Sequence, residues 1–137
     1  MVYEVRGVTA DARMQSVAPV LLVKDVMAAA AYYRDQLGFE YEYFYGNPAS
    51  FCIVHRDVCC VMLREVEDAK HVVPHCEVVS EMWNVYVWVD DVDQMFKEMK
   101  VRGAEMDGEI VTRPYGVREF GVRDLDGYGI RFGMEVR

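Results

Sequence analysis

Three residues in the middle of the chain have the types and spacing of a metal site. His71 and His75 are four positions apart, with Glu77 close by, and on a helix two imidazoles at this spacing lie on one face. The stretch Val72-Val73-Pro74 argues against a helix there, because a proline disfavours helical geometry in the residue before it. The sequence therefore predicts two solvated histidines in a linker and no metal bound by them.

The cysteines are a second group that could act as ligands or nucleophiles. Cys52, Cys59, Cys60 and Cys76 show neither the paired spacing of a metal-binding motif nor the density of a secreted disulfide scaffold. A Cys–His nucleophile pair could be assembled from them, but no sequence motif supports one. We expect these thiols to be reduced and mostly structural, as in a cytoplasmic protein.

Charged residues near the C-terminal end form two further candidates. Asp124 and Asp126 fall in a short polar run, where two carboxylates without further oxygen ligands favour a hairpin turn over a calcium site. Arg118 and Glu119 are neighbours in a predicted strand, so only one of them can face a given side of the sheet. An inward Arg118 could pair with a carboxylate ligand, whereas an inward Glu119 could pair with a cation or act as a base. Both orientations, and a plain surface ion pair, remain open.

The bulk composition indicates one folded domain and excludes several classes of function. The chain has 137 residues, of which 53% are hydrophobic, and a net charge of −8, which is too apolar a composition for a disordered chain. No apolar run approaches the roughly 18 residues of a membrane helix, and residues 1–14 carry charges where a signal peptide would be apolar. A pI of about 4.8 argues against nucleic acid as a partner and favours a cationic ligand. We expect a cytoplasmic protein.

Two stretches of the chain repeat one another. Asp25 begins a helical stretch that ends at Gly38, and Asp91, 66 residues later, begins another that ends at Gly103. Aspartate is a typical helix N-cap and glycine a typical helix end, and a short apolar run precedes each aspartate. A repeat of about half the chain predicts two similar units packed together, with a cleft between them.

Each repeat has the pattern of one strand, one helix and three strands. Apolar runs separated by turn residues predict these strands: Val17–Val23, Phe39–Tyr45, Phe51–His55 and Val58–Arg64, then Trp83–Val89, Ala104–Thr112, Val117–Arg123 and Tyr128–Met134. We therefore expect a single domain, residues 1–137, with an N-terminal extension (1–16), a first unit (17–64), a linker (65–82) and a second unit (83–135). Alternation places Asn84, Tyr86 and Trp88 on one face of their strand.

This pattern resembles a known family. The duplicated βαβββ unit and several short runs are similar to the vicinal oxygen chelate superfamily, which includes glyoxalases, bleomycin resistance proteins and dioxygenases. The runs are Leu22-Val23-Lys24-Asp25-Val26, Tyr32–Phe39 and Arg118–Tyr128, and Pro114-Tyr115-Gly116 is similar to the bleomycin resistance branch in particular. The resemblance implies an α+β fold in which two tandem βαβββ units form a cupped mixed β-sheet.

The resemblance also implies where a metal would bind. Enzymes of the superfamily hold one divalent cation with four side chains, from the first and last strands of each unit, for Lewis-acid chemistry. The matching positions here are Ala18, Met62, Asn84 and Arg131. Ala18 and Met62 cannot hold a hard cation, Asn84 offers only a neutral carbonyl, and Arg131 would put a positive charge in the cation's place. The resemblance thus predicts a metal-free member without a cofactor, and no catalytic residue is assigned.

The same positions would mark the inward face of the cup, which we expect to be apolar and aromatic. Tyr and Trp rings can stack on planar heterocycles or attract cations. The residues expected to bind a ligand are Trp88, Tyr86, Asn84, Arg131, Met62, Tyr115, Phe39 and Glu119. We predict a protein that sequesters an aromatic or cationic, antibiotic-like molecule. The resemblance further implies a homodimer with ligand grooves at the subunit interface, and residues 1–16 could embrace the partner chain.

Two other functions fit the same fold. A metal-dependent glyoxalase-like lyase or isomerase, or a dioxygenase, would need ligands outside the four matching positions, and bound metal with turnover of a hydroxy-thioester or a catechol would identify it. An interaction module whose cup is filled by its own side chains would gain no stability from any small molecule. We expect neither nucleic acid nor a membrane as a partner.

Overall fold

The structure is a computed structural model that describes residues 4–136. It confirms the predicted α+β fold of two βαβββ units. The elements of the first unit are β3 (Val20–Val23), α1 (Val26–Leu37), β4 (Phe44–Tyr45), β5 (Phe51–Arg56) and β6 (Cys59–Glu65). Those of the second unit are β7 (Val85–Trp88), α2 (Val92–Arg102), β8 (Glu105–Thr112), β9 (Val117–Arg123) and β10 (Gly129–Glu135).

Both helices begin and end at the residues that the sequence indicates. The side chains of Asp25 and Asp91 each accept a hydrogen bond of 3.0 Å from the backbone N–H three residues later, which satisfies one of the free donors of a first helical turn. Gly38 and Gly103 end the helices with φ angles of 76° and 81°. Glycine adopts this left-handed conformation without steric cost.

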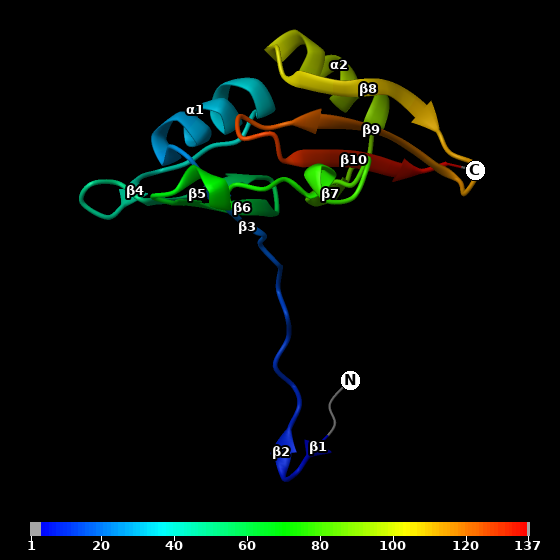
Figure 1. Cartoon of the computed structure of the whole chain (residues 1–137). Helices are drawn as coiled ribbons and strands as arrows, with labels where there is room; N and C mark the ends of the chain where they lie inside the picture. The colour runs from blue at the N-terminus through cyan, green and yellow to red at the C-terminus, as the bar shows by residue number, and fades with distance from the viewer. Residues whose placement is uncertain (1–3, 137) are drawn as a thin grey trace.

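Each unit forms its own four-stranded mixed sheet. The strand orders are β3-β6-β5-β4 and β7-β10-β9-β8, and in each sheet the first strand of the unit pairs in parallel with the last. The two helices lie on the same side of the two sheets (Figure 1), so one face of each sheet is covered by a helix. Neither α1 nor α2 is long and apolar enough to cross a membrane.

Several element boundaries differ from the prediction. Strand β3 begins at Val20 instead of Val17, after Pro19, which has no N–H to donate to a ladder. The strand expected over residues 39–45 is reduced to β4, and Glu40 alone forms an isolated bridge with His55. The linker contains two short 3₁₀ helices, η1 (Ala69–His71) and η2 (His75–Glu77). His71 and His75 therefore lie on separate turns and do not share one helical face.

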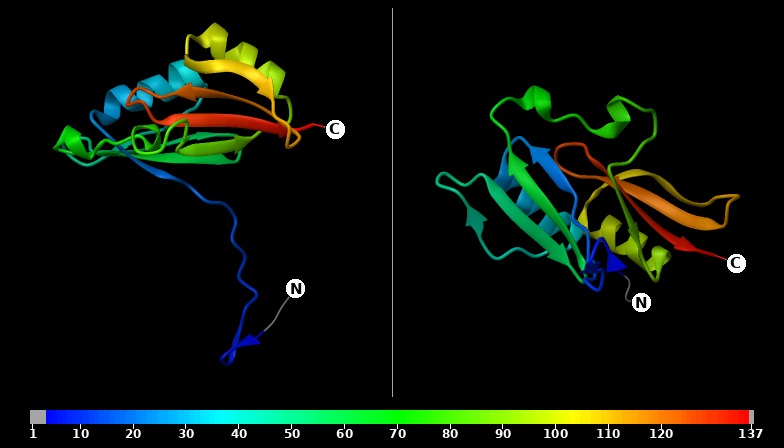
Figure 2. Two further views of the ribbon diagram at one scale, coloured as in Figure 1. Left: turned by 45° about the vertical axis from the view of Figure 1, so that its right-hand side comes forward. Right: turned by 90° about the horizontal axis from the view of Figure 1, so that it is seen from below.

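The N-terminal segment extends away from the rest of the molecule. Strands β1 (Glu4–Val5) and β2 (Val8–Thr9) pair as a small antiparallel hairpin, which the sequence did not indicate. Figures 1 and 2 show this hairpin far from both sheets, at the end of an extended stretch that leads to β3. The extension projects on the side of the sheets that the helices leave open.

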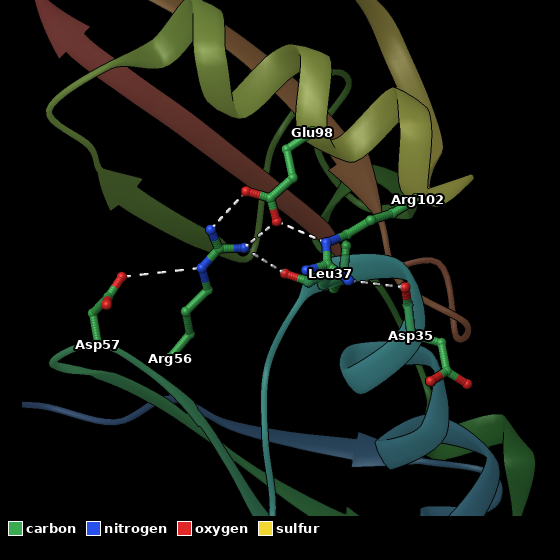
Figure 3. A network of polar contacts seen from close by, with 6 residues as sticks. All are labelled: Asp35, Leu37, Arg56, Asp57, Glu98 and Arg102. Atoms are coloured by element: carbon green, nitrogen blue, oxygen red, sulfur yellow. Dashed lines mark hydrogen bonds and ion pairs between the residues drawn. The ribbon is translucent and has the colours of Figure 1, made fainter.

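A network of polar contacts around Glu98 of α2 joins the two units (Figure 3). Arg56, at the end of β5, donates two hydrogen bonds of 2.8 Å to the Glu98 carboxylate, and Arg102 donates a third of 2.7 Å. Arg56 also donates to the backbone carbonyl of Leu37, the last residue of α1, at 3.0 Å. The hydrogen bonds from Arg56, supported by Arg102, lower the pKa of Glu98 to about 2.

A second contact between the units is buried. Tyr33 of α1 donates a hydrogen bond of 2.7 Å to Oδ2 of Asp124 in the β9–β10 turn. Oδ1 of Asp124 accepts from the backbone N–H groups of Asp126 at 3.0 Å and Tyr128 at 2.9 Å. Burial outweighs these three hydrogen bonds and raises the pKa of Asp124 to about 6. The predicted hairpin turn is present, and it also anchors the first helix.

Candidate functional site

The residues of strand β9 alternate between the helix-covered face of the second sheet and its open face. The ring of Phe120 packs against that of Phe96 on α2, with 5.2 Å between ring centroids, and Arg118 pairs with Asp93 of the same helix at 3.0 Å. Because successive strand residues point to opposite faces, Glu119 lies on the open face. The structure thus settles the alternatives for the pair: Glu119 is inward and Arg118 faces the helix.

Glu119 is the centre of a buried cluster on this open face. Its side chain is 2% exposed. Oε1 accepts a hydrogen bond of 2.7 Å from the hydroxyl of Tyr86 on β7. Oε2 accepts from Arg131 Nη1 on β10 at 3.0 Å, from the hydroxyl of Tyr115 at 3.1 Å and from Arg113 Nε at 3.2 Å. The sheet therefore brings together four of the residues expected to bind a ligand.

The cluster holds Glu119 in its charged form. Burial by itself would raise the pKa of the Glu119 carboxyl, but the four hydrogen bonds outweigh it and hold that pKa below its ordinary value. The same contact acts in the opposite direction on the phenol: burial, and then the bond to Glu119, raise the pKa of Tyr86 well above its ordinary value. At neutral pH the carboxylate is thus an acceptor and the tyrosine a donor.

A cavity of about 1010 Å³ lies over this cluster. Its walls come from the linker, from the β8–β9 hairpin and from the strand faces. The lining residues are Cys76, Ser80, Glu81, Met82, Trp83, Asp107, Gly108, Glu109, Val111, Arg113, Pro114, Tyr115, Glu119, Arg123 and Arg131. Tyr115 is 66% exposed, so its ring is available to a ligand. This size is enough for a small organic molecule, and the lining is richer in charged residues than such sites usually are.

Two glycines provide room on the open face beside the cluster. Gly133 of β10 faces Glu119 across the ladder, and Gly121 of β9 faces Arg131. A Cβ atom at Gly133 would collide with the Tyr86 hydroxyl. At Gly121 a Cβ atom would lie 3.5 Å from the nearest atom, in Asp107, which is an ordinary contact. Only the first glycine is needed for the Tyr86–Glu119 hydrogen bond.

We expect Gly133→Ala to lower the free energy of unfolding by about 1–3 kcal/mol, because the added methyl forces Tyr86 off its hydrogen bond in a well-packed site. Gly121→Ala, on the same face and the neighbouring strand, should be close to neutral or slightly stabilising. Urea unfolding of both variants, with near-UV circular dichroism to follow the aromatic cluster, measures the contrast. Equal costs for the two substitutions would contradict this account of the Gly133 contact.

Trp88 and Asn84 flank the cluster without joining it. The Trp88 ring lies 4.9 Å from that of Tyr86, centroid to centroid, and is 61% exposed. Asn84 Oδ1 accepts a hydrogen bond of 3.0 Å from the backbone N–H of His75, so this side chain fastens the linker to the sheet. Of the three residues expected on one face of β7, only Tyr86 reaches the buried carboxylate.

Met62 and Phe39 lie in the first unit, apart from the Glu119 cluster. Met62 is half-buried on β6, where it pairs across the sheet with Val20 and Ile53. Phe39 is 5% exposed and packs edge-on against Tyr33, with 5.5 Å between centroids. The structure therefore places Phe39 in the core of the first unit.

The four positions that match the superfamily's metal ligands do not fit a divalent cation. Arg131 occupies one of them, and its guanidinium is committed to Glu119. Asn84 occupies another, and its carbonyl oxygen is used by the linker. Within residues 4–136, no three His, Cys, Asp or Glu side chains gather closely enough to hold one ion.

Sequence reasoning missed two residues of the site, Arg113 and Trp83. Arg113 reaches Glu119 from just beyond the end of β8. Trp83 was expected on the opposite face to Tyr86, yet its ring lies under the guanidinium of Arg131 at 4.9 Å. The strand starts only at Val85, so alternation does not extend back to Trp83. A strand predicted to begin at Val85 would have left the side of Trp83 open.

Comparison with known proteins places this chain in a wider group. Residues 13–132 match the sequence model of the Glyoxalase/Bleomycin resistance protein/Dioxygenase superfamily, which covers both βαβββ units. No curated protein matches the chain at a significant level.

Solved structures share the fold at low sequence identity. TioX from Micromonospora sp. ML1 has a TM-score of 0.67 and 22% identity, covering 87% of this chain and 97% of TioX. TnmS3, an antibiotic binding protein from Streptomyces sp. CB03234, has a TM-score of 0.67 and 21% identity, covering 92% and 98%. A glyoxalase-related enzyme from Clostridium phytofermentans has a TM-score of 0.72 and 16% identity, covering 93% and 99%.

Proposed function

Because the chain belongs to the Glyoxalase/Bleomycin resistance protein/Dioxygenase superfamily, we propose that it binds and sequesters a small aromatic, antibiotic-like molecule. The observation that carries this proposal is the cavity of about 1010 Å³ over a buried polar cluster. Tyr115 and Trp83 offer aromatic surface in its walls, and the cluster supplies fixed polar groups that would orient a ligand. The likeness to TnmS3, an antibiotic binding protein, supports the same function.

A thermal-shift assay tests this proposal with three probes: bleomycin, the planar cation proflavine and the planar anion anthraquinone-2-carboxylate. A ligand that prefers the folded state stabilises it by about 2.7 kcal/mol at one hundred times its Kd, or roughly 10 °C in Tm for a chain of this size. We expect at least one probe to raise Tm. Tyr115→Ala should reduce that shift, whereas Val101→Ala, on the exposed side of α2, should preserve it. No shift with any probe would contradict the proposal.

We further propose that the protein acts in the cytoplasm as a homodimer. The face of the first sheet that α1 leaves open exposes Val20, Leu22 and Tyr45, and exposed apolar side chains gathered on one surface are typical of a protein interface. The N-terminal segment extends on the same side of the sheets (Figure 2), where it could embrace a second copy; residues 1–3 of the expected extension lie outside the described part.

Light scattering after size exclusion checks the homodimer. We expect about twice the chain mass of 15.8 kDa for the full chain. Val20→Glu should shift the mass towards one chain, because a buried unpaired carboxylate is costly at an interface. Val101→Glu, on the helix-covered side, is the matched control and should leave the mass unchanged. A single-chain mass for the unmodified protein would contradict a dimer.

A further inference from the structure

The buried carboxylate of the cavity is already surrounded by donors of the protein. Glu119 accepts four hydrogen bonds, one on Oε1 and three on Oε2. Each carboxylate oxygen has about two lone-pair sites, so Oε2 is fully used, whereas Oε1 keeps one site beside the Tyr86 bond. With 2% of its side chain exposed and two arginines beside it, Glu119 offers little surface or uncompensated charge to an incoming cation.

Arg131, in contrast, has unused donors inside the cavity. Its guanidinium carries five N–H groups, and in the described part of the chain its one recorded hydrogen bond runs from Nη1 to Glu119. Nε of Arg131 is fully buried and has no hydrogen-bond partner. The guanidinium lies over the Trp83 ring at 4.9 Å, which fixes its plane. A buried donor without a partner is costly. Because Nε is fully buried, a ligand in the cavity would bond Arg131 through the N–H groups of its two terminal nitrogens, of which the Glu119 bond uses one.

Arg113 offers a second set of donors at the mouth of the cavity. Its Nε bonds Glu119 at 3.2 Å, and within residues 4–136 its two terminal nitrogens make no hydrogen bond to the protein. The side chain is 42% exposed, so these nitrogens can reach an incoming molecule. Arg113 and Arg131 together carry two positive charges against the single charge of Glu119, which leaves this part of the cavity positive.

Over the whole lining four carboxylates face three arginines, so the positive excess is confined to the part beside Glu119. Asp107 in the wall is paired with Arg123 at 3.5 Å. Glu81 and Glu109 line the cavity and are exposed, as Arg113 is, so solvent and salt screen these three charges alike, and neither acid has a recorded contact with Arg113 or Arg131 among the described ion pairs. The overall charge of −8 would draw a cation to the surface, but the fixed groups beside Glu119 present donors.

From this inventory of donors and acceptors we propose that the cavity selects planar aromatic ligands with acceptor oxygens, such as carbonyl, phenolate or carboxylate groups, over planar cations. The aromatic part would lie against Tyr115 and Trp83, and the oxygens would accept hydrogen bonds from Arg131 and Arg113. Guanidinium N–H groups can bond each of these oxygens, and they can hold a carboxylate through two parallel bonds. This inference rests on the proposed binding function and reverses the ligand charge that the acidic composition favours.

Two tricyclic probes of opposite chemistry test the selection. Isothermal titration calorimetry of the full chain at pH 7 and 150 mM NaCl would compare anthraquinone-2-carboxylate, which brings only acceptors, with the cation proflavine. At this ionic strength the exposed surface charges are largely screened beyond about 8 Å. We expect anthraquinone-2-carboxylate to bind at least tenfold more tightly than proflavine.

Variants then assign the preference to residues. Arg113→Gln removes a half-exposed charge, so the fold should tolerate it. We expect it to weaken anthraquinone-2-carboxylate at least fivefold and to leave proflavine within twofold. Glu119→Gln should strengthen anthraquinone-2-carboxylate, since both arginines lose their counter-charge. Arg118→Gln, one residue along the same strand but on the helix-covered face, is the control for loss of one positive charge and should change neither affinity more than twofold.

The outcomes separate this inference from the proposed function. Tighter binding of proflavine, or an Arg113→Gln variant that weakens both probes equally, would overturn the selection for acceptor oxygens and leave the sequestering function in place. Loss of proflavine binding in Glu119→Gln would point to the carboxylate as a cation site and would also overturn it. If no aromatic probe binds at all, including bleomycin, the inference and the proposed function fail together.

Discussion

Replacing Glu119 with leucine should lower the free energy of unfolding by about 3–5 kcal/mol, the usual cost of removing one partner from a buried ion pair. The carboxylate is 2% exposed and Arg131 is 13% exposed, so the variant would leave a nearly buried guanidinium without its counter-charge. The hydroxyl of Tyr86 would also lose its acceptor. Urea unfolding at pH 7, followed by far-UV circular dichroism, measures the change.

The neighbouring residue provides a matched control. Arg118→Leu breaks an ion pair with Asp93 in which both side chains are partly exposed, and pairs of this kind contribute about 1 kcal/mol or less. The double variant Glu119→Leu with Arg131→Met should recover part of the loss, because neither buried charge then remains. A cost for Glu119→Leu no greater than that for Arg118→Leu would contradict the burial of the cluster.

The stability of the fold should also depend on pH through Asp124. Its pKa is about 6 in the folded chain, against an ordinary value of 3.8, so the folded state holds a proton that the unfolded state releases. The stability that this proton gives the folded state is therefore fully present below pH 3.8. It falls as the pH rises from 3.8 and is lost once the pH passes about 6. A shift of roughly two pKa units corresponds to about 3 kcal/mol.

Asp124→Asn should remove this dependence while keeping the contacts. The amide oxygen can accept from the backbone groups that Oδ1 serves, and the amide nitrogen can donate to the Tyr33 hydroxyl in place of Oδ2. From pH 4 to pH 7, we expect the variant to gain up to about 3 kcal/mol relative to the unmodified protein, as measured by urea unfolding at each pH. Parallel pH profiles would show that Asp124 ionises normally.

Glu98 gives an internal comparison of opposite sign. Its pKa is lowered to about 2 from an ordinary value of 4.5, so its contribution is present above pH 4.5 and is lost as the pH falls towards 2. The free energy of unfolding of Glu98→Gln should therefore differ from that of the unmodified protein mainly above pH 4.5. The difference should shrink as the pH falls towards 2. The two carboxyls act in separate pH ranges because arginine side chains surround one and burial dominates the other.

Much of the fold could be predicted because its signals are local. The caps Asp25 and Asp91 act on N–H groups three residues away, and the glycines that end the helices are the next residues after them. These features need no knowledge of the rest of the chain. The repeat of 66 residues then indicated that both halves share one topology, and this too is confirmed by the strand orders.

The candidate site could be predicted only in part. Alternation and the resemblance together selected Tyr86 and Arg131, which are direct partners in the β7–β10 ladder, and they included Glu119 and Tyr115. They also included Phe39, which lies in the core, and Asn84, which holds the linker. Strand alternation says which residues share a face, but it does not say whether a given side chain is used by the ligand site or by the structure.

The sequence by itself determined the two βαβββ units and their helix boundaries. It also determined the acidic charge and the lack of a metal-binding cysteine motif. Each of these depends on composition or on short runs of neighbouring residues. Only the tertiary structure decided which of Arg118 and Glu119 faces inward, since that follows from the packing of α2 on one face of β9. It also decided which charged groups meet in the cavity. Tyr86 and Glu119 are 33 residues apart, and Arg113 joins them only through a hairpin, so their contacts appear in no local pattern.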